Sequence, residues 1–242
     1  MIRRPPRSTP KPSSAASDVY KRQDKERYEH KYEYCDLLIT GSGPSGLASA
    51  YAAAKNGARV ILAEDKPRFG GSLLTSDVNI GNQTGVEWTE KIIAELKSMP
   101  NVTVKNRSQV FGYYDHNMLV MSERISDHLP KTQKYLPKQR LWYIRANEVL
   151  ISSGSIERPL VFGNNDTPGV MLSSAAKEYM KVYGVLVGKK PLIFTNNDSG
   201  YETAIEFKKN GVNPIILDTR SNPSSDIITE AKNLNIEIKF SY

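Results

Sequence analysis

Three glycines near the front of the chain have the spacing of a phosphate-binding loop. Gly41, Gly43 and Gly46 lie in the run GSGPSG, between a short apolar stretch and an alanine-rich one. At this spacing the first glycine permits a tight turn and the second lets the backbone approach a pyrophosphate. The third lets the following helix pack closely on the strand, and the helix N-terminus then faces the phosphate charge. The run therefore predicts binding of a dinucleotide.

Residues further along the chain add to this site. Glu64 follows the second apolar stretch, where a carboxylate accepts hydrogen bonds from ribose hydroxyls and would repel a 2′-phosphate. The sequence thus favours NAD, or the ADP half of FAD, over NADP. Gly70 and Gly71, followed by the hydroxyl donor Ser72, are typical of the second backbone segment that flavin-type folds bring to the pyrophosphate. Gly154, in LISSGS, is expected to pass close to the cofactor, with a simple turn as the alternative.

Hydrophobic patterning predicts the elements that place these residues. Leu37–Thr40 and Arg59–Ala63 are typical of buried strands, and Pro44–Asn56 of the helix between them. Thr84 and Glu87 form a capping box that predicts a further helix. The rest is expected to comprise short strands at 102–104, 109–113, 118–121, 141–144 and 148–152, a loop over 127–139, a helix over 173–183, and a lead-in without a clear period over 24–34.

The same pattern returns in the last part of the chain. Aligning Gly200 on Gly46 places Asp218 on Glu64 at identical spacing, so a second β-α-β unit is expected from Pro191 onward. A helix over 226–233 and a strand over 236–240 follow it.

The second unit lacks part of the chemistry of the first. Thr195 and Asn197 stand at the positions of the first two glycines, where side chains should obstruct a pyrophosphate. We therefore expect one competent dinucleotide site, and we interpret Asp218 as a vestigial or solvated acid.

Together the elements predict an α/β protein. Its first part is expected to be an FAD/NAD(P)-binding Rossmann-like fold with a β-meander insertion, over 24–186. An incomplete second Rossmann-like domain with a degenerate glycine loop is expected over 187–242. Because its sheet would be cut short, we expect the chain to be a fragment whose natural termini lie outside it.

The positive charge of the chain is concentrated at its front. The 242 residues include 33 Lys or Arg and 26 Asp or Glu, a net charge of +7, and residues 1–23 account for +5 of it. Those residues resemble the in-frame translation of a sequencing adapter in the runs MIRRPPRST and SSAASDVYKRQ. We expect an artefactual or disordered arm there, and neither nucleic acid nor a membrane as partner.

Composition limits the function further. No apolar run reaches the roughly 18 residues of a transmembrane helix. The single cysteine, Cys35, cannot form an internal disulfide; we interpret it as a small buried thiol and expect a reducing, cytoplasmic location. Three histidines without ligand spacing predict no metal site.

With these motifs assembled, the sequence resembles the α subunits of heterotetrameric sarcosine oxidase, a family within the flavoproteins that contain two dinucleotide-type folds. Its most specific segments are SSGSIERPLVFGNNDTPGVMLSSA and FTNNDSGYETA. The resemblance implies noncovalent NAD at the glycine loop. The contacts it implies are Ser45, Glu64, Asp65, Lys66, Ser72 and Val110.

The resemblance also implies an activity and partners. Such complexes oxidatively demethylate sarcosine to glycine, with tetrahydrofolate as one-carbon acceptor and O2 reduced to H2O2. They contain β, γ and δ subunits, and the full complex binds FMN or FAD and tetrahydrofolate, so the isolated chain is expected to be inactive. One alternative is an FAD-dependent amine- or opine-oxidising subunit of the same superfamily, with FAD in the Gly41 site. The other is a nucleotide-binding scaffold without catalysis.

Overall fold

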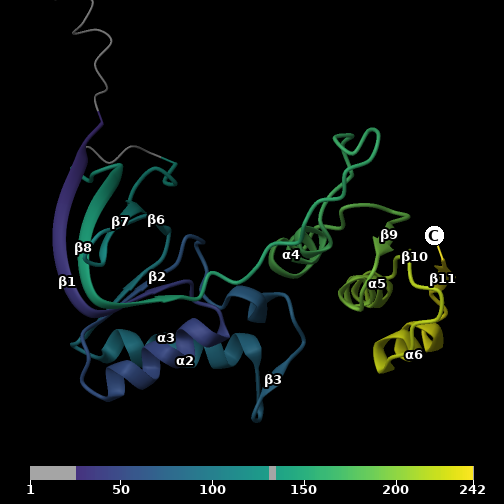
Figure 1. Ribbon diagram of the computed structural model, residues 1–242, viewed down its shortest axis with the longest axis horizontal. Coiled ribbons are helices and arrows are strands. Elements are labelled where there is room, and N and C mark those ends of the chain that lie inside the picture. The colour runs from purple at the N-terminus through teal and green to yellow at the C-terminus, as the bar shows by residue number, and fades with distance from the viewer. Residues whose placement is uncertain (1–25, 131–134, 242) are drawn as a thin grey trace, which may run out of the picture.

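The computed structural model describes residues 26–130 and 135–241 (Figure 1). The arm expected over residues 1–23 lies outside these residues, as does part of the loop expected over 127–139. The described residues form a six-stranded sheet of order β5-β2-β1-β8-β7-β6, a three-stranded sheet of order β11-β10-β9 and the short ribbon β3-β4. None of their helices is long and apolar enough to cross a membrane.

The first unit begins with the predicted β-α-β arrangement. Strand β1 (Tyr28–Thr40) is followed by helix α2 (Pro44–Lys55) and by β2 (Val60–Ala63), which pairs in parallel with β1. Helix α3 (Gly85–Ser98) and strand β5 (Val102–Lys105) extend the unit, and α2 and α3 cover one face of the sheet (Figure 1). The core under these helices includes Ile39, Leu47, Ala50, Val60, Leu62, Ile92, Ile93 and Leu96.

The predicted meander follows. Strands β6 (Ser108–Tyr114), β7 (Met118–Arg124) and β8 (Gln139–Ile151) are antiparallel neighbours, and β8 returns beside β1. A second core lies between the meander and the parallel strands, with Cys35, Leu38, Ile61, Leu119, Met121, Trp142 and Ile144 among its members. Burial, together with nearby acidic groups, raises the pKa of the Cys35 thiol to about 12, which agrees with a packing role.

Two sequence-based element assignments are wrong. The lead-in over 24–34 has no predicted strand, yet β1 begins at Tyr28; the two strands predicted at 141–144 and 148–152 are one strand, β8. The cause is the parallel pairing of β1 with β8, which runs from Tyr28 beside Gln139 to Thr40 beside Ile151. Backbone hydrogen bonds extend the strands beyond the apolar run, into a region where exposed aromatic rings and charges hide the pattern.

Short elements connect β2 to α3. The 3-10 turn η1 (Gly71–Leu74) comes first, and the strands β3 (Asn79–Ile80) and β4 (Gln83–Thr84) follow it. The predicted capping box is present at the start of α3: the Thr84 hydroxyl accepts from the Glu87 amide at 3.2 Å, and the Glu87 carboxylate accepts from the Thr84 amide at 2.8 Å.

The second unit repeats the first on a smaller scale. It comprises β9 (Leu192–Thr195), α5 (Ser199–Lys209), β10 (Ile215–Asp218), α6 (Asp226–Asn233) and β11 (Glu237–Phe240), with all three strands parallel. Its core includes Tyr201, Ala204, Phe207, Ile216, Ile228 and Ala231. The predicted partial Rossmann-like unit is therefore confirmed.

Helix α4 (Ser173–Tyr183) lies between the two units and ends at Gly184, as predicted. Ala176 and Met180 pack into the core of the second unit. Lys181 pairs with Asp77, from the η1-β3 connection, at 2.7 Å and with Glu206 of α5 at 3.0 Å. Ion pairs from α4 therefore reach both units, while the connection from β8 to α4 projects away from both sheets (Figure 1).

Candidate dinucleotide site

The glycine loop lies between the end of β1 and the start of α2. Gly41 has a φ of 99°, and a Cβ added there would lie 2.3 Å from the carbonyl oxygen of Ser152. At Gly46 an added Cβ would lie 2.0 Å from the carbonyl oxygen of Gly41. Both positions therefore exclude any side chain, because strand ends and helix are packed backbone against backbone.

Gly43 differs from the other two glycines. Its φ of −66° suits any residue, and an added Cβ would meet no heavy atom within 4 Å. Glycine at this position is thus not required by packing. The open space beside its backbone is where the close approach of a pyrophosphate is expected.

The paired glycines lie directly against this loop. Gly70 and Gly71 both have left-handed backbones, with φ of 122° and 53°. A Cβ on Gly71 would lie 2.9 Å from the Cα of Gly43, and the Gly70 amide donates to the Ser42 carbonyl at 3.1 Å. The structure thus brings together two backbone segments that are far apart in sequence, with the exposed Ser72 next to them in η1.

Glu64 connects the end of β2 to the glycine loop. Its side chain is 6% exposed, and one carboxylate oxygen accepts from both the amide of Ser42 at 2.9 Å and its hydroxyl at 2.5 Å. The other oxygen accepts from the Lys66 amide at 3.0 Å. A carboxylate has about four lone-pair positions, so this geometry leaves capacity for a ribose hydroxyl.

Three further residues implied by the resemblance lie around Glu64. Asp65 and Lys66 are exposed beside it, and the Lys66 ammonium pairs with Glu178 of α4 at 2.7 Å. Partial burial opposes the charge of Lys66, but Glu178 outweighs it, so the pKa of Lys66 is raised. Val110 is half-buried in β6, whose first residue, Ser108, donates its amide to the Glu64 carbonyl at 2.7 Å.

The remaining predicted residues lie at the start of α2 and after β8. Ser45 is exposed in the first turn of α2, and the N-cap residue Gly43 makes no side-chain cap. Gly154 has a φ of 71° and open space at its Cβ position. Sequence reasoning missed Ser152, the residue after β8 that touches the glycine loop, although a small residue at the end of that strand is a usable signal.

The corresponding loop of the second unit is filled by its own side chains. A Cβ on Gly200 would lie 2.7 Å from the Cβ of Thr195, and the Thr195 hydroxyl donates to the Asn197 carbonyl at 2.9 Å. The Asn197 side-chain oxygen accepts from the amide of Ser199 at 3.0 Å and from its hydroxyl at 2.6 Å. An amide at the start of α5 that could bind a phosphate is therefore already bonded.

Asp218 is buried and fully paired. It accepts from the Tyr201 hydroxyl at 2.7 Å and from the Arg220 guanidinium at 2.9 and 3.0 Å. Burial acts to raise the pKa of Asp218, but Arg220 and Tyr201 outweigh it and lower that pKa. The interpretation of Asp218 as a solvated acid is wrong, because Tyr201 and Arg220 replace the smaller Leu47 and the outward-pointing Lys66 of the first unit.

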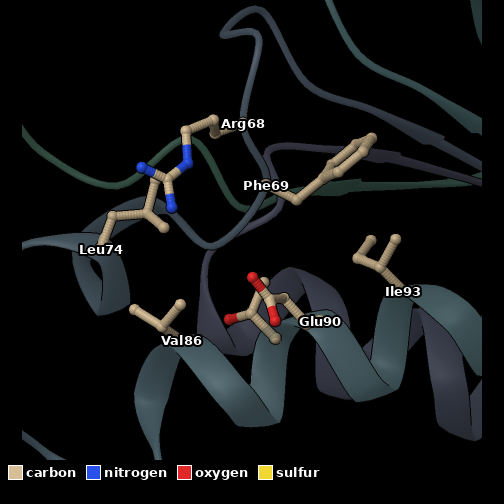
Figure 2. A pocket seen from close by; sticks show the side chains of 7 residues that line it. Arg68, Phe69, Leu74, Val86, Glu90 and Ile93 are labelled. Carbon is tan, nitrogen blue, oxygen red and sulfur yellow. The ribbon is translucent and has the colours of Figure 1, made fainter. Parts of the chain in front are cut away.

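A cavity of about 170 Å³ lies beside the paired-glycine segment (Figure 2). Val86, Glu90 and Ile93 from α3 face Arg68 and Phe69 across it. None of the predicted site residues lines the cavity, so it is separate from the glycine loop. In the described part of the chain, no group of three or more His, Cys, Asp or Glu side chains could hold a metal ion.

An open glycine loop, a second glycine segment and a buried acid at the carboxyl ends of parallel strands define a dinucleotide-type Rossmann fold. Residues 36–128 match the family described as FAD dependent oxidoreductase. L-proline dehydrogenase from P. horikoshii has a similar structure, with a TM-score of 0.63 at 21% identity over 82% of this chain and 38% of that one. Thioredoxin reductase from T. acidophilum gives 0.57 at 17% identity over 86% and 64%. The predicted fold class is confirmed.

Curated relatives confirm the resemblance drawn from the motifs. The chain is 44% identical to the alpha subunit of sarcosine oxidase from Rhizobium meliloti (strain 1021) over 198 residues, which is 81% of this chain and 20% of the relative. The corresponding protein of Corynebacterium sp. (strain P-1) is 36% identical over 84% of this chain and 21% of its own length. An opine oxidase subunit from Agrobacterium tumefaciens (strain Ach5) is 26% identical over 67% and 33%. The chain spans about a fifth of the length of the sarcosine oxidase subunits that it matches.

Proposed function

We propose that the glycine loop binds a dinucleotide through its ADP part, and that NAD is this dinucleotide. Gly43 carries the proposal: Gly71 closes one side of its backbone, while the direction of its missing side chain is open. No packing contact explains a glycine at this position, whereas close approach of a pyrophosphate does.

The residues around Gly43 fit such a ligand. The backbone of Gly43 and the first turn of α2, which contains Ser45, would hold the pyrophosphate, since no side chain caps that helix. Glu64 would accept from the ribose, with Asp65 and Lys66 beside it. Gly71, Ser72, Val110 and Gly154 complete the proposed set. NAD supplies hydride transfer when bound.

The proposed wider role is that of the α subunit of a sarcosine-oxidising complex. The names of the relatives at 44% and 36% identity support it. We propose that the complex demethylates sarcosine to glycine with tetrahydrofolate as one-carbon acceptor and O2 as oxidant, giving H2O2. Its β, γ and δ subunits would assemble in the cytoplasm and contribute the flavin. The present residues would bind the dinucleotide without oxidising the amine.

The second candidate places FAD in the same site. The family description, FAD dependent oxidoreductase, favours it, as does the similarity to an opine oxidase subunit. NAD and FAD share the ADP part, so the glycine loop serves either. The two candidates differ in what lies beyond the pyrophosphate.

Titration of the full chain with NAD and with FAD, followed by calorimetry, tests both candidates. Gly43→Ala should leave the melting temperature unchanged, because the φ is ordinary and the space is empty. Its methyl group should weaken the bound dinucleotide at least about tenfold, or roughly 1.4 kcal/mol.

Gly188→Ala is the matched control, since Gly188 also has open space at its Cβ position but lies outside the site. Tighter binding of NAD supports the first candidate, and stoichiometric FAD without NAD affinity supports the second. A wild-type chain that binds neither dinucleotide contradicts the proposal.

A further inference from the structure

Ser42 lies between the first two glycines of the loop and is fully buried. We propose that Ser42 is a positioning residue, whose hydroxyl joins the glycine loop, the acid after β2 and the paired glycines into one dinucleotide-binding unit. This inference rests on the proposed dinucleotide site and adds a residue that would touch no ligand.

The geometry of the hydroxyl supports this role. The Ser42 Oγ donates to Glu64 at 2.5 Å and accepts from the Gly70 amide at 3.2 Å. A single side-chain atom therefore contacts both of the other segments. A buried hydroxyl with both its donor and an acceptor position used has a fixed orientation, and it fixes the groups bonded to it.

Backbone bonds of the same residue add to the connection. The Ser42 amide donates to Glu64 at 2.9 Å, and its carbonyl accepts from Gly70 at 3.1 Å. These two bonds would survive the loss of the side chain. The hydroxyl therefore has a separable effect: it restricts the Glu64 carboxylate and the start of η1 without being needed to hold the strands together.

The second unit shows what the loop looks like without this residue. Asn196 occupies the position of Ser42, is exposed, and bonds to the adjacent Asn197. Asp218 there takes its hydrogen bonds from Tyr201 and Arg220 and none from the loop at this position. A glycine-poor loop thus coincides with the loss of the buried hydroxyl.

The test uses Ser42→Ala in the full chain, with Asn196→Ala as the matched control. Ser42→Ala should lower affinity for whichever of NAD or FAD binds the wild-type chain by about fivefold to tenfold. Affinity for AMP should fall less, because AMP spans fewer of the three segments. Asn196→Ala should change neither affinity.

A double-mutant cycle with Glu64→Gln separates positioning from general damage. If Ser42 acts through Glu64, then Ser42→Ala should cost little further affinity in the Glu64→Gln background. Full additivity of the two losses, or unchanged affinity in Ser42→Ala, would overturn the inference.

Amide hydrogen exchange provides a readout without ligand. Ser42→Ala should speed exchange of residues 68–74 about tenfold in the free chain, while α5 stays unchanged. Unchanged exchange there would also overturn the inference. Faster exchange in a chain whose wild type binds neither NAD nor FAD would retain the connection and refute the dinucleotide site, so the two failures are distinguishable.

Discussion

The two Rossmann-like units share a backbone plan and differ in the loop that faces the ligand. Each places a strand, a glycine-containing turn, a helix and a second strand at the same spacing, and each ends that strand with a buried acid. In the first unit Gly43 faces open space. In the second, Asn197 stands at that position and bonds to the start of the helix.

The features common to both units are those that packing requires. Gly46 and Gly200 each have a neighbour within 3 Å of an added Cβ. Glu64 and Asp218 each accept a backbone amide from two residues further on, at 3.0 and 2.9 Å. The comparison teaches that the fold needs the third glycine and the acid, whereas ligand binding is proposed to need the glycine that packing does not require.

The largest effect is expected where packing is tightest. Gly46→Ala should lower the free energy of unfolding by about 3 kcal/mol, because the new methyl group would lie 2.0 Å from the backbone oxygen of Gly41. Gly200→Ala meets the Thr195 side chain at 2.7 Å and should cost less, about 1–2 kcal/mol. Urea unfolding of each variant measures the difference.

A second substitution checks the cause. Thr195→Gly should recover part of the loss in Gly200→Ala, since the clash is with a side chain. No side-chain truncation can relieve Gly46→Ala, because the clash there is with a carbonyl group. Equal costs for the two alanine variants would show that the units are packed alike after all.

The next effect concerns the acid of the second unit. Tyr201→Phe removes the 2.7 Å hydrogen bond to buried Asp218 and should cost about 1.5–3 kcal/mol at pH 7. The pKa of Asp218 is lowered in the folded state, so its contribution is complete above its ordinary pKa near 3.9. That contribution is lost as the pH falls through the lowered value, and the cost of Tyr201→Phe should shrink below about pH 3.

Thermal unfolding at pH 7 and pH 2.5 gives the comparison. Tyr183→Phe is the control, since this exposed ring lies on α4 and makes no hydrogen bond to Asp218. Trp88 and Trp142 both lie in the first unit, so their fluorescence reports on that unit separately. An equal cost at both pH values would mean that the charge of Asp218 does not contribute.

Much of this comparison follows from the sequence alone. The spacing shared by Gly46 and Gly200 predicts both β-α-β units, and the capping box predicts the start of α3. The exposed ends of β1 and β8 were missed because their stability comes from pairing with each other rather than from an apolar pattern. The roles of Ser42 and Arg220 were missed because a side chain's hydrogen-bond partners depend on the fold, which spacing along the chain does not specify.

The smallest expected effect lies at Lys66, the counterpart of Arg220. Its ammonium is 49% exposed and pairs with Glu178 across the boundary to α4, whereas Arg220 turns back onto a buried acid. A double-mutant cycle of Lys66→Ala with Glu178→Ala should give about 0.5 kcal/mol of coupling, falling toward zero at 1 M salt. If Lys66 contacts the dinucleotide as proposed, saturating ligand should also abolish the coupling, because one ammonium cannot serve both anions fully. Coupling that persists with ligand bound would assign Lys66 to α4 alone, and the phosphate charge would then be balanced by the backbone of the glycine loop.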